Sequence, residues 1–145
     1  MTKKARTRAS AVVVYGGRLL CIKAVDPHSK KVYLILPGGE VEAGETPEEA
    51  AVRETYEETG YKVETYERQA IGTRTTKRYD FLWNNIVYDC TTHFLRAELI
   101  SSVHSPDKVD DADYIKGYEW VSLTKLNETF DYHKDILDAI MELTE

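Results

Sequence analysis

The sequence of 145 residues predicts an α/β protein in which a mixed β-sheet lies between helices. Runs of apolar and β-branched residues, which are typical of strands, occur both before and after one strongly capped helix. A second helix, apolar along one side, ends the chain. No repeat or low-complexity segment interrupts this order, and the length suits a single domain that buries about two-thirds of its unfolded surface.

The first strands are predicted at 9–15, 18–25 and 32–36, where aliphatic and β-branched residues dominate. The pair Gly16-Gly17 indicates a hairpin between the first two strands. The loop residues of 26–29 separate the second strand from the third.

Residues 1–8 contain four basic side chains and no apolar run of the length that a signal peptide has. We therefore expect neither a signal peptide nor a membrane span here. We interpret 1–8 as a basic, frayed start and expect one domain at 9–145.

A helix is predicted directly after Thr46. Thr46 is a favourable N-cap, Pro47 occupies the first helical position, and Glu49 completes a capping box. Gly60 supplies the left-handed residue that commonly ends a helix.

After this helix, 62–73 and 86–99 are predicted as longer strands and 119–121 as a short one. The segment 134–143 has apolar residues at helical spacing and is expected to close the domain as an amphipathic helix. Those apolar residues are Ile136, Leu137, Ile140 and Met141.

Acidic residues are concentrated in the first helix and the loop before it. Eight of the 25 acidic residues lie between Glu40 and Glu58, where Arg53 is the one basic residue, so this window accounts for nearly all of the net charge of −6. Glu54, Glu57 and Glu58 follow i, i+3, i+4 spacing, which gathers three carboxylates within roughly 100° of one helix face. Like charges so placed repel, and a bound Mg²⁺ or Mn²⁺ would relieve the repulsion.

A solvated acidic helix with ordinary salt bridges is the alternative interpretation, with pairs such as Glu49–Arg53 and Arg53–Glu57. It explains any single pair. It does not explain why Gly38-Gly39, Gly44-Glu45 and Arg53-Glu54 stand at fixed offsets from one another.

The residues from Gly39 to Tyr61 resemble the signature of the Nudix hydrolases. Gly39 is followed after five residues by Glu45, after seven more by Arg53-Glu54, after two by Glu57-Glu58, and after one by Gly60. Thr55 and Tyr61 stand where that family prefers bulky aliphatic residues, a departure that concerns packing. The resemblance implies the Nudix fold, an α/β/α sandwich with a mixed sheet between helices.

The resemblance also implies an enzyme that hydrolyses a nucleoside diphosphate linked to another group, using water activated by Mg²⁺ or Mn²⁺. Glu54, Glu57 and Glu58 would be metal ligands together with the backbone carbonyl of Gly39. An ion pair between Glu45 and Arg53 would support them from behind.

By the same resemblance, the proton acceptor would be a helix glutamate, Glu54 or Glu57, or an acid outside the motif. The outside candidates are Asp113, which we favour, Glu119, and the neighbouring acids Asp110 and Asp111. Taken singly, each of these four is better explained as a solvated loop acid than as a catalytic group.

Substrate specificity must come from outside the motif. Arg74, Lys77 and Arg78 form a basic run without an acid, which suits a segment that faces phosphate as well as a solvated strand edge. Tyr79 lies eighteen residues after Tyr61, where the family's dinucleoside polyphosphate hydrolases have a tyrosine. Trp83 and Tyr88 suit stacking on a base equally well. In the same family a proline in this neighbourhood accompanies ADP-ribose pyrophosphatases, and the absence of proline between Tyr61 and Ser105 therefore argues against ADP-ribose.

Two functional classes follow. The favoured one is a pyrophosphohydrolase of nucleoside triphosphates or dinucleoside polyphosphates, with ADP-ribose or a sugar nucleotide as alternative substrates. A 5′-capped or triphosphorylated RNA end has the weakest support, because there is no extended basic surface. The other class is a catalytically silent Nudix module that binds a nucleotide or a protein partner.

Cys21 and Cys90 lie in strand-like runs without metal-binding spacing, so we expect buried free thiols and a cytoplasmic protein with no membrane partner. The four histidines show no paired metal spacing, and His93, in a predicted central strand, is the one that we expect to face the site.

Overall fold

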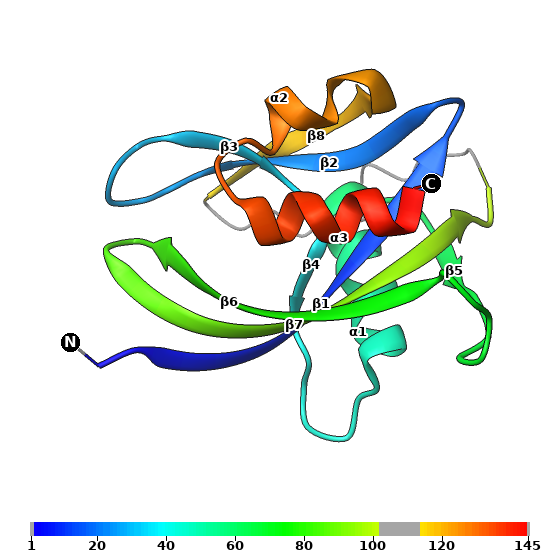
Figure 1. Ribbon diagram of the computed structural model, residues 1–145, viewed down its shortest axis with the longest axis horizontal. Coiled ribbons are helices and arrows are strands. Elements are labelled where there is room, and N and C mark those ends of the chain that lie inside the picture. Colours follow the sequence, from blue (N-terminus) through cyan, green and yellow to red (C-terminus); the bar gives the residue numbers. More distant parts are fainter. Residues whose placement is uncertain (1, 102–113, 145) are drawn as a thin grey trace.

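The computed structural model describes residues 2–101 and 114–144 (Figure 1). Within them, the main path of one sheet runs β3-β2-β1-β7-β5, with β4 paired to β1, β6 to β7 and β8 to β2. The strands are β1 (Lys4–Tyr15), β2 (Arg18–Val25), β3 (Val32–Ile35), β4 (Gly38–Glu40), β5 (Val63–Thr65), β6 (Arg74–Trp83), β7 (Ile86–Leu99) and β8 (Ile115–Ser122). The helices are α1 (Pro47–Thr59), α2 (Leu126–Thr129) and α3 (Lys134–Thr144), with a 3₁₀ turn η2 (Leu123–Lys125) before α2.

Strand β1 joins the two halves of the sheet. It runs parallel to β7 over Lys4–Val13, and its last residues, Val14 and Tyr15, pair antiparallel with β2. Its middle also pairs antiparallel with the short β4, which places Ala9 beside Gly39. The sheet is therefore mixed, with β1 paired in parallel to β7 and antiparallel to β2 and β4.

The two faces of the sheet are covered by different helices (Figure 1). On one face Ala9, Ala11 and Val13 of β1 belong to a core that includes Ala50 and Ala51 of α1. On the other face Val12 belongs to a core that includes residues of α3. Because alternate side chains of a strand point to opposite faces, β1 contributes to both cores. The predicted sandwich of a mixed sheet between helices is confirmed.

Strands β2 and β7 have the bounds that the sequence predicts, and Cys21 and Cys90 are buried and free as expected. Among the helices described, none is long and apolar enough to span a bilayer.

The start of the chain differs from the prediction. We expected residues 1–8 to be frayed, but β1 begins at Lys4 and pairs in register with β7 from Tyr88 to Thr92. The reason is a partner far along the chain, because main-chain pairing orders residues whose local sequence has no strand signal.

The predicted strand at 62–73 is also wrong over most of its length. The structure has a strand only at Val63–Thr65 and a turn-rich segment before β6 begins at Arg74. The short strand expected at 119–121 is longer and spans Ile115–Ser122, because β2 offers it a paired edge.

Asp26 ties two loops together. Its side chain is 3 % exposed, and its carboxylate accepts hydrogen bonds from the backbone N–H groups of His28, Ser29 and Asn84. Burial raises the pKa of Asp26, but these backbone hydrogen bonds outweigh it and leave the pKa below its usual value. The loop after β2 is thereby held against the turn between β6 and β7.

We expect Asp26→Asn to lower the free energy of unfolding by about 1–2 kcal/mol at pH 7, since the amide replaces a charged acceptor of three N–H groups. The pKa of the folded carboxyl is depressed, so its stabilisation is full above the unfolded pKa and is lost as the pH falls below about 4. Urea unfolding at pH 7 and pH 3 measures this, with the exposed Asp131→Asn as control. An equal loss at both pH values would contradict the prediction.

Candidate active site

Helix α1 is bounded by the signals that the sequence contains. The Thr46 hydroxyl accepts a hydrogen bond from the Glu49 N–H at 3.1 Å, and the Glu49 carboxylate accepts one from the Thr46 N–H at 2.9 Å. At the other end Gly60 adopts a left-handed conformation with φ of 80° and donates to the Tyr56 carbonyl. These caps determine which residues of α1 face the sheet.

The face of α1 that packs on the sheet is made of small residues and threonines. Thr55 and Thr59 are fully buried, and their hydroxyls donate to the carbonyls of Ala51 and Thr55 at 2.7 and 2.6 Å. Thr55 therefore replaces a bulky aliphatic residue without leaving a buried hydroxyl unpaired. Tyr61 is 8 % exposed and its ring contacts that of Trp120. Both departures from the motif are accommodated by packing.

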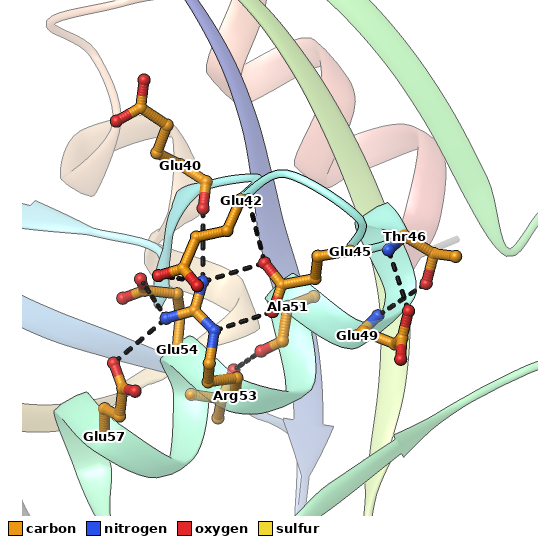
Figure 2. A network of polar contacts seen from close by, with 10 residues as sticks. Glu40, Glu42, Glu45, Thr46, Glu49, Ala51, Arg53, Glu54 and Glu57 are labelled. Atoms are coloured by element: carbon orange, nitrogen blue, oxygen red, sulfur yellow. Dashed lines mark hydrogen bonds and ion pairs between the residues drawn. The ribbon is translucent and has the colours of Figure 1, made fainter.

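Arg53 lies at the centre of the acidic cluster (Figure 2). Its Nε and one terminal nitrogen donate to the two Glu45 oxygens at 2.8 and 3.0 Å, a bidentate pair. Its other terminal nitrogen donates to Glu54 at 2.8 Å and to Glu57 at 3.3 Å. The Arg53 hydrogen bonds lower the pKa of Glu45. One cation thus joins the loop before α1 to two carboxylates of the helix.

This network also decides between the two salt bridges considered from the sequence. The Arg53–Glu57 pair is present at 3.3 Å. Glu49 instead accepts from the Thr46 N–H in the capping box, so it serves the helix start.

Glu58 is a buried acid. Glu58 is 5 % exposed, and its Oε1 accepts a hydrogen bond from the Gly38 N–H at 2.8 Å. Burial raises the pKa of Glu58 to about 8, against the lowering effect of the Gly38 hydrogen bond. Burial also raises the pKa of Glu54. Two neighbouring carboxyls are therefore costly to ionise unless a cation comes close.

Gly39 lies directly against the Glu54 carboxylate. A Cβ at position 39 would stand 2.6 Å from the carboxylate carbon of Glu54, which is closer than side chains approach in proteins. Gly39 therefore leaves room for a carboxylate beside the main chain of β4. This close approach brings the backbone of β4 and the acids of α1 into one place.

The donor set fits a divalent cation by its chemistry, although its side chains are not arranged around one. Within 2–101 and 114–144, no group of three His, Cys, Asp or Glu side chains is placed to hold a metal ion. Arg53 donates hydrogen bonds to Glu54 and Glu57. The donors are all oxygens, and burial raises the pKa of Glu54 and Glu58, so a bound cation would stabilise their charged forms. Oxygen donors of this kind suit Mg²⁺ or Mn²⁺.

A cavity opens beside these residues. Glu58 and Gly38 form part of its wall, and half of the other residues that line it are aromatic. The rings that line it are those of Tyr79, Phe81, Trp83, Tyr88, Phe94, Tyr114 and Tyr132. A flat, apolar ring suits the part of this cavity that the aromatic side chains line. A cation suits the part beside the Glu58 carboxyl.

The predicted substrate residues divide between the two faces of β6. Tyr79 lines the cavity, and its hydroxyl bonds to Thr92 at 2.9 Å. Arg74 and Arg78 lie on the other face, where they pair with Glu48 and Asp89, each at 2.7 Å.

Lys77 shares the face of Tyr79 but pairs with Glu142 of α3 at 2.7 Å. The structure therefore brings one of the four predicted substrate residues, Tyr79, to the cavity wall.

Of the four acids proposed from outside the motif, Glu119 is the one that the structure describes, and it is not brought to the site. Glu119 is exposed on β8 and does not line the cavity. Asp110, Asp111 and Asp113 lie outside the described residues. His93 was expected to face the site, but it lies on the face of β7 that carries Leu95, opposite the cavity-lining Cys90 and Phe94.

Two cavity residues were missed from the sequence. Arg6 and Arg8 of β1 line the cavity, with the Arg6 guanidinium 4.4 Å from the centre of the Tyr88 ring. Arg6 and Arg8 are two residues apart, as neighbours on one face of a strand are, but the sequence of 1–8 has no apolar alternation that would have identified the strand.

Comparisons with known proteins agree with this geometry. A family model described as the NUDIX domain matches residues 5–141. A MutT-like protein of Streptomyces ambofaciens is 42 % identical over 69 residues, which are 48 % of this chain and 42 % of the relative. The match thus spans less than half the length of that relative.

Solved structures share the fold at low sequence identity. A NUDIX hydrolase from Nitrosomonas europaea has a TM-score of 0.72 at 21 % identity, covering 96 % of this chain and 88 % of the other. The C. elegans Ap4A hydrolase in a binary complex has a TM-score of 0.68 at 20 % identity, with 96 % and 95 % covered. A MutT protein from Methanosarcina mazei Go1 has a TM-score of 0.65 at 20 % identity, with 100 % and 99 % covered.

Proposed function

This chain belongs to the Nudix hydrolase family, and from that premise we propose that it is a Mg²⁺- or Mn²⁺-dependent pyrophosphohydrolase of nucleotides. The proposed substrate is a nucleoside triphosphate or a dinucleoside polyphosphate. One observation carries the proposal: the buried carboxyl of Glu58 lines the same cavity as a wall of aromatic rings. A nucleotide has a flat base that suits the aromatic wall. Its phosphate chain suits the Glu58 end once a divalent cation lies between the phosphates and the carboxyl.

The chemistry requires a cation because the phosphate oxygens of a diphosphate repel a nucleophile. A divalent cation, when bound, would neutralise those oxygens and make a water molecule easier to deprotonate. Glu54, Glu57 and Glu58 would hold this cation with the Gly39 carbonyl.

The protein residues around the cation have separate roles in this proposal. Arg53 holds the Glu45 loop against α1 through the bidentate pair, which keeps the carboxylates in position. Glu54 or Glu57 accepts the proton of the attacking water. Asp113 and Glu119 stay as candidates for the same task from outside the motif.

The base of the nucleotide would stack in the ring-lined cavity. The cavity is lined by Tyr79, Trp83 and Tyr88, whose ring faces can stack on any base. Such a wall accepts different bases, so the phosphate chain contributes strongly to the choice of substrate.

Other substrates suit the same cavity. The likeness to an Ap4A hydrolase makes dinucleoside polyphosphates part of any assay. ADP-ribose, sugar nucleotides and a triphosphorylated RNA end also place a ring beside a phosphate chain. A catalytically silent module is the alternative in kind, and a relative that lost catalysis would be expected to lose a ligand glutamate, whereas Glu54, Glu57 and Glu58 are all present.

We expect phosphate release from one class of nucleotide, and a fall of at least about 100-fold when EDTA removes the divalent cation. The assay couples phosphate or pyrophosphate release to a colour reaction across nucleoside triphosphates, dinucleoside polyphosphates, ADP-ribose, sugar nucleotides and a triphosphorylated RNA. Restoring Mg²⁺ or Mn²⁺ after EDTA treatment is the control.

Turnover that survives EDTA would contradict the proposed metal chemistry. A folded protein that binds Mn²⁺ and hydrolyses no member of the panel would favour the silent module.

A further inference from the structure

We propose that Arg8 binds the phosphate chain of the substrate, at the boundary between the carboxylates of α1 and the ring-lined cavity. This inference rests on the proposed function, because it names how the same site holds an anionic substrate. No motif of the sequence points to Arg8, which lies within the segment interpreted as a frayed start.

The strand register brings Arg8 to the site. Arg8 stands opposite Glu40 of β4 and Thr92 of β7 in the middle of the sheet. Alternate residues of a strand share a face, and Arg6, Arg8 and Ser10 all line the cavity. The Arg8 side chain therefore shares a wall with Glu58.

Arg8 is unpaired within the described part of the chain. Among the residues described, it makes neither an ion pair nor a side-chain hydrogen bond, although it is half-buried. The arginines of β6 differ, since Arg74 and Arg78 pair with Glu48 and Asp89. A guanidinium that is half-withdrawn from water without a partner is unfavourable, so an anionic ligand would stabilise it.

The cavity brings Arg8 together with both parts of the site. Arg8 lines the same cavity as Glu58 and as the rings of Tyr79 and Tyr114. A phosphate chain that reaches from a cation at Glu58 to a base among the rings would therefore run through the space that Arg8 lines.

The chemistry of this position favours phosphate. A guanidinium presents a planar fork of N–H donors that matches the oxygens of phosphate in a bidentate manner. The neighbouring Arg6 already lies over the Tyr88 ring at 4.4 Å. Among the described residues that line the cavity, the one acid is Glu58, so a phosphate beside Arg8 meets little repulsion once a cation is bound.

The test uses inorganic tripolyphosphate, which has phosphate and no base, as the probe. Isothermal titration in Mg²⁺ compares the unmodified protein with Arg8→Gln, Arg8→Lys and the control Arg18→Gln, an exposed arginine at the start of β2. We expect Arg8→Gln to weaken binding at least about tenfold, Arg8→Lys to lie between because it keeps the charge and loses the fork, and Arg18→Gln to have no effect. Mg²⁺ affinity without tripolyphosphate should stay unchanged in all variants.

The same variants are assayed with the best nucleotide found in the panel, where Arg8→Gln should raise KM more than it lowers kcat. If Arg8 served only to balance the charge of the glutamates, Mg²⁺ affinity would change in Arg8→Gln and Arg8→Lys would behave like the unmodified protein, and the inference would be overturned. Failure of the unmodified protein to bind tripolyphosphate would overturn it as well.

The two proposals can fail separately. Tripolyphosphate binding through Arg8 without turnover of any nucleotide removes the proposed function and keeps the inference. Nucleotide turnover with an unchanged KM in Arg8→Gln removes the inference and keeps the proposed function.

Discussion

Glu57→Gln is expected to lower kcat/KM by at least about 100-fold while the melting temperature stays within a few degrees of the unmodified protein. Loss of residues that merely orient metal ligands costs about 10–100-fold, so loss of a ligand charge costs that much or more. The side chain of Glu57 is 40 % exposed, and among the described residues its one ion pair is the 3.3 Å contact with Arg53, so the fold depends little on it.

The measurement combines turnover of the best nucleotide with a Mn²⁺ titration, which reads ligand loss even without activity. Glu64→Gln is the matched control, because Glu64 is an exposed glutamate of β5 on the strand face opposite Val63, the residue that shares a core with α1. Near-normal turnover and unchanged Mn²⁺ affinity in Glu57→Gln would show that Glu57 is not a metal ligand.

Gly38→Ala and Gly39→Ala are expected to fail in different ways, although the residues are adjacent. A Cβ on Gly38 would lie 2.4 Å from the Ala9 carbonyl oxygen and 2.8 Å from the Ser10 Cα, which are backbone atoms of a central strand. Since this backbone cannot give way cheaply, we expect a loss of about 3 kcal/mol and a fall of roughly 10 °C in melting temperature.

The three atoms nearest to a Cβ on Gly39 all belong to the Glu54 carboxylate, the far end of a flexible side chain. We therefore expect Gly39→Ala to cost less than about 1 kcal/mol of stability, while displacing Glu54 and lowering activity and Mn²⁺ affinity at least about tenfold. Thermal unfolding and Mn²⁺ titration of both variants measure the contrast. Two variants that lose stability equally and retain Mn²⁺ binding would refute the proposed use of this close approach.

The parts of the site that the sequence predicted are those whose partners lie close along the chain. The capping box of Thr46 and Glu49, the stop at Gly60, and the spacing of Glu54, Glu57 and Glu58 all follow from helix geometry over a few residues. The Glu45–Arg53 pair was expected from the motif and spans only eight positions.

The features that were predicted wrongly or not predicted depend on pairing between strands that are distant in the chain. Alternation along β6, once its pairing with β7 is known, sends Arg74 and Arg78 away from the cavity. The basic composition of 73–79 gave no information about which side chains share a face. The strand at 62–73 was similarly predicted from composition, and the loop within it was missed.

The sequence by itself determined that this protein has a capped acidic helix between strands, carries the Nudix motif and contains the oxygen donors for a divalent cation. Each of these depends on residue types at short, fixed separations, which helix and turn geometry convert directly into positions. Only the tertiary structure decided that β1 starts at Lys4, that Gly39 lies against Glu54, and that Arg8 shares a cavity with Glu58. These arrangements depend on the register between β1, β4 and β7, because pairing between strands distant in the chain is set by the packing of the whole domain.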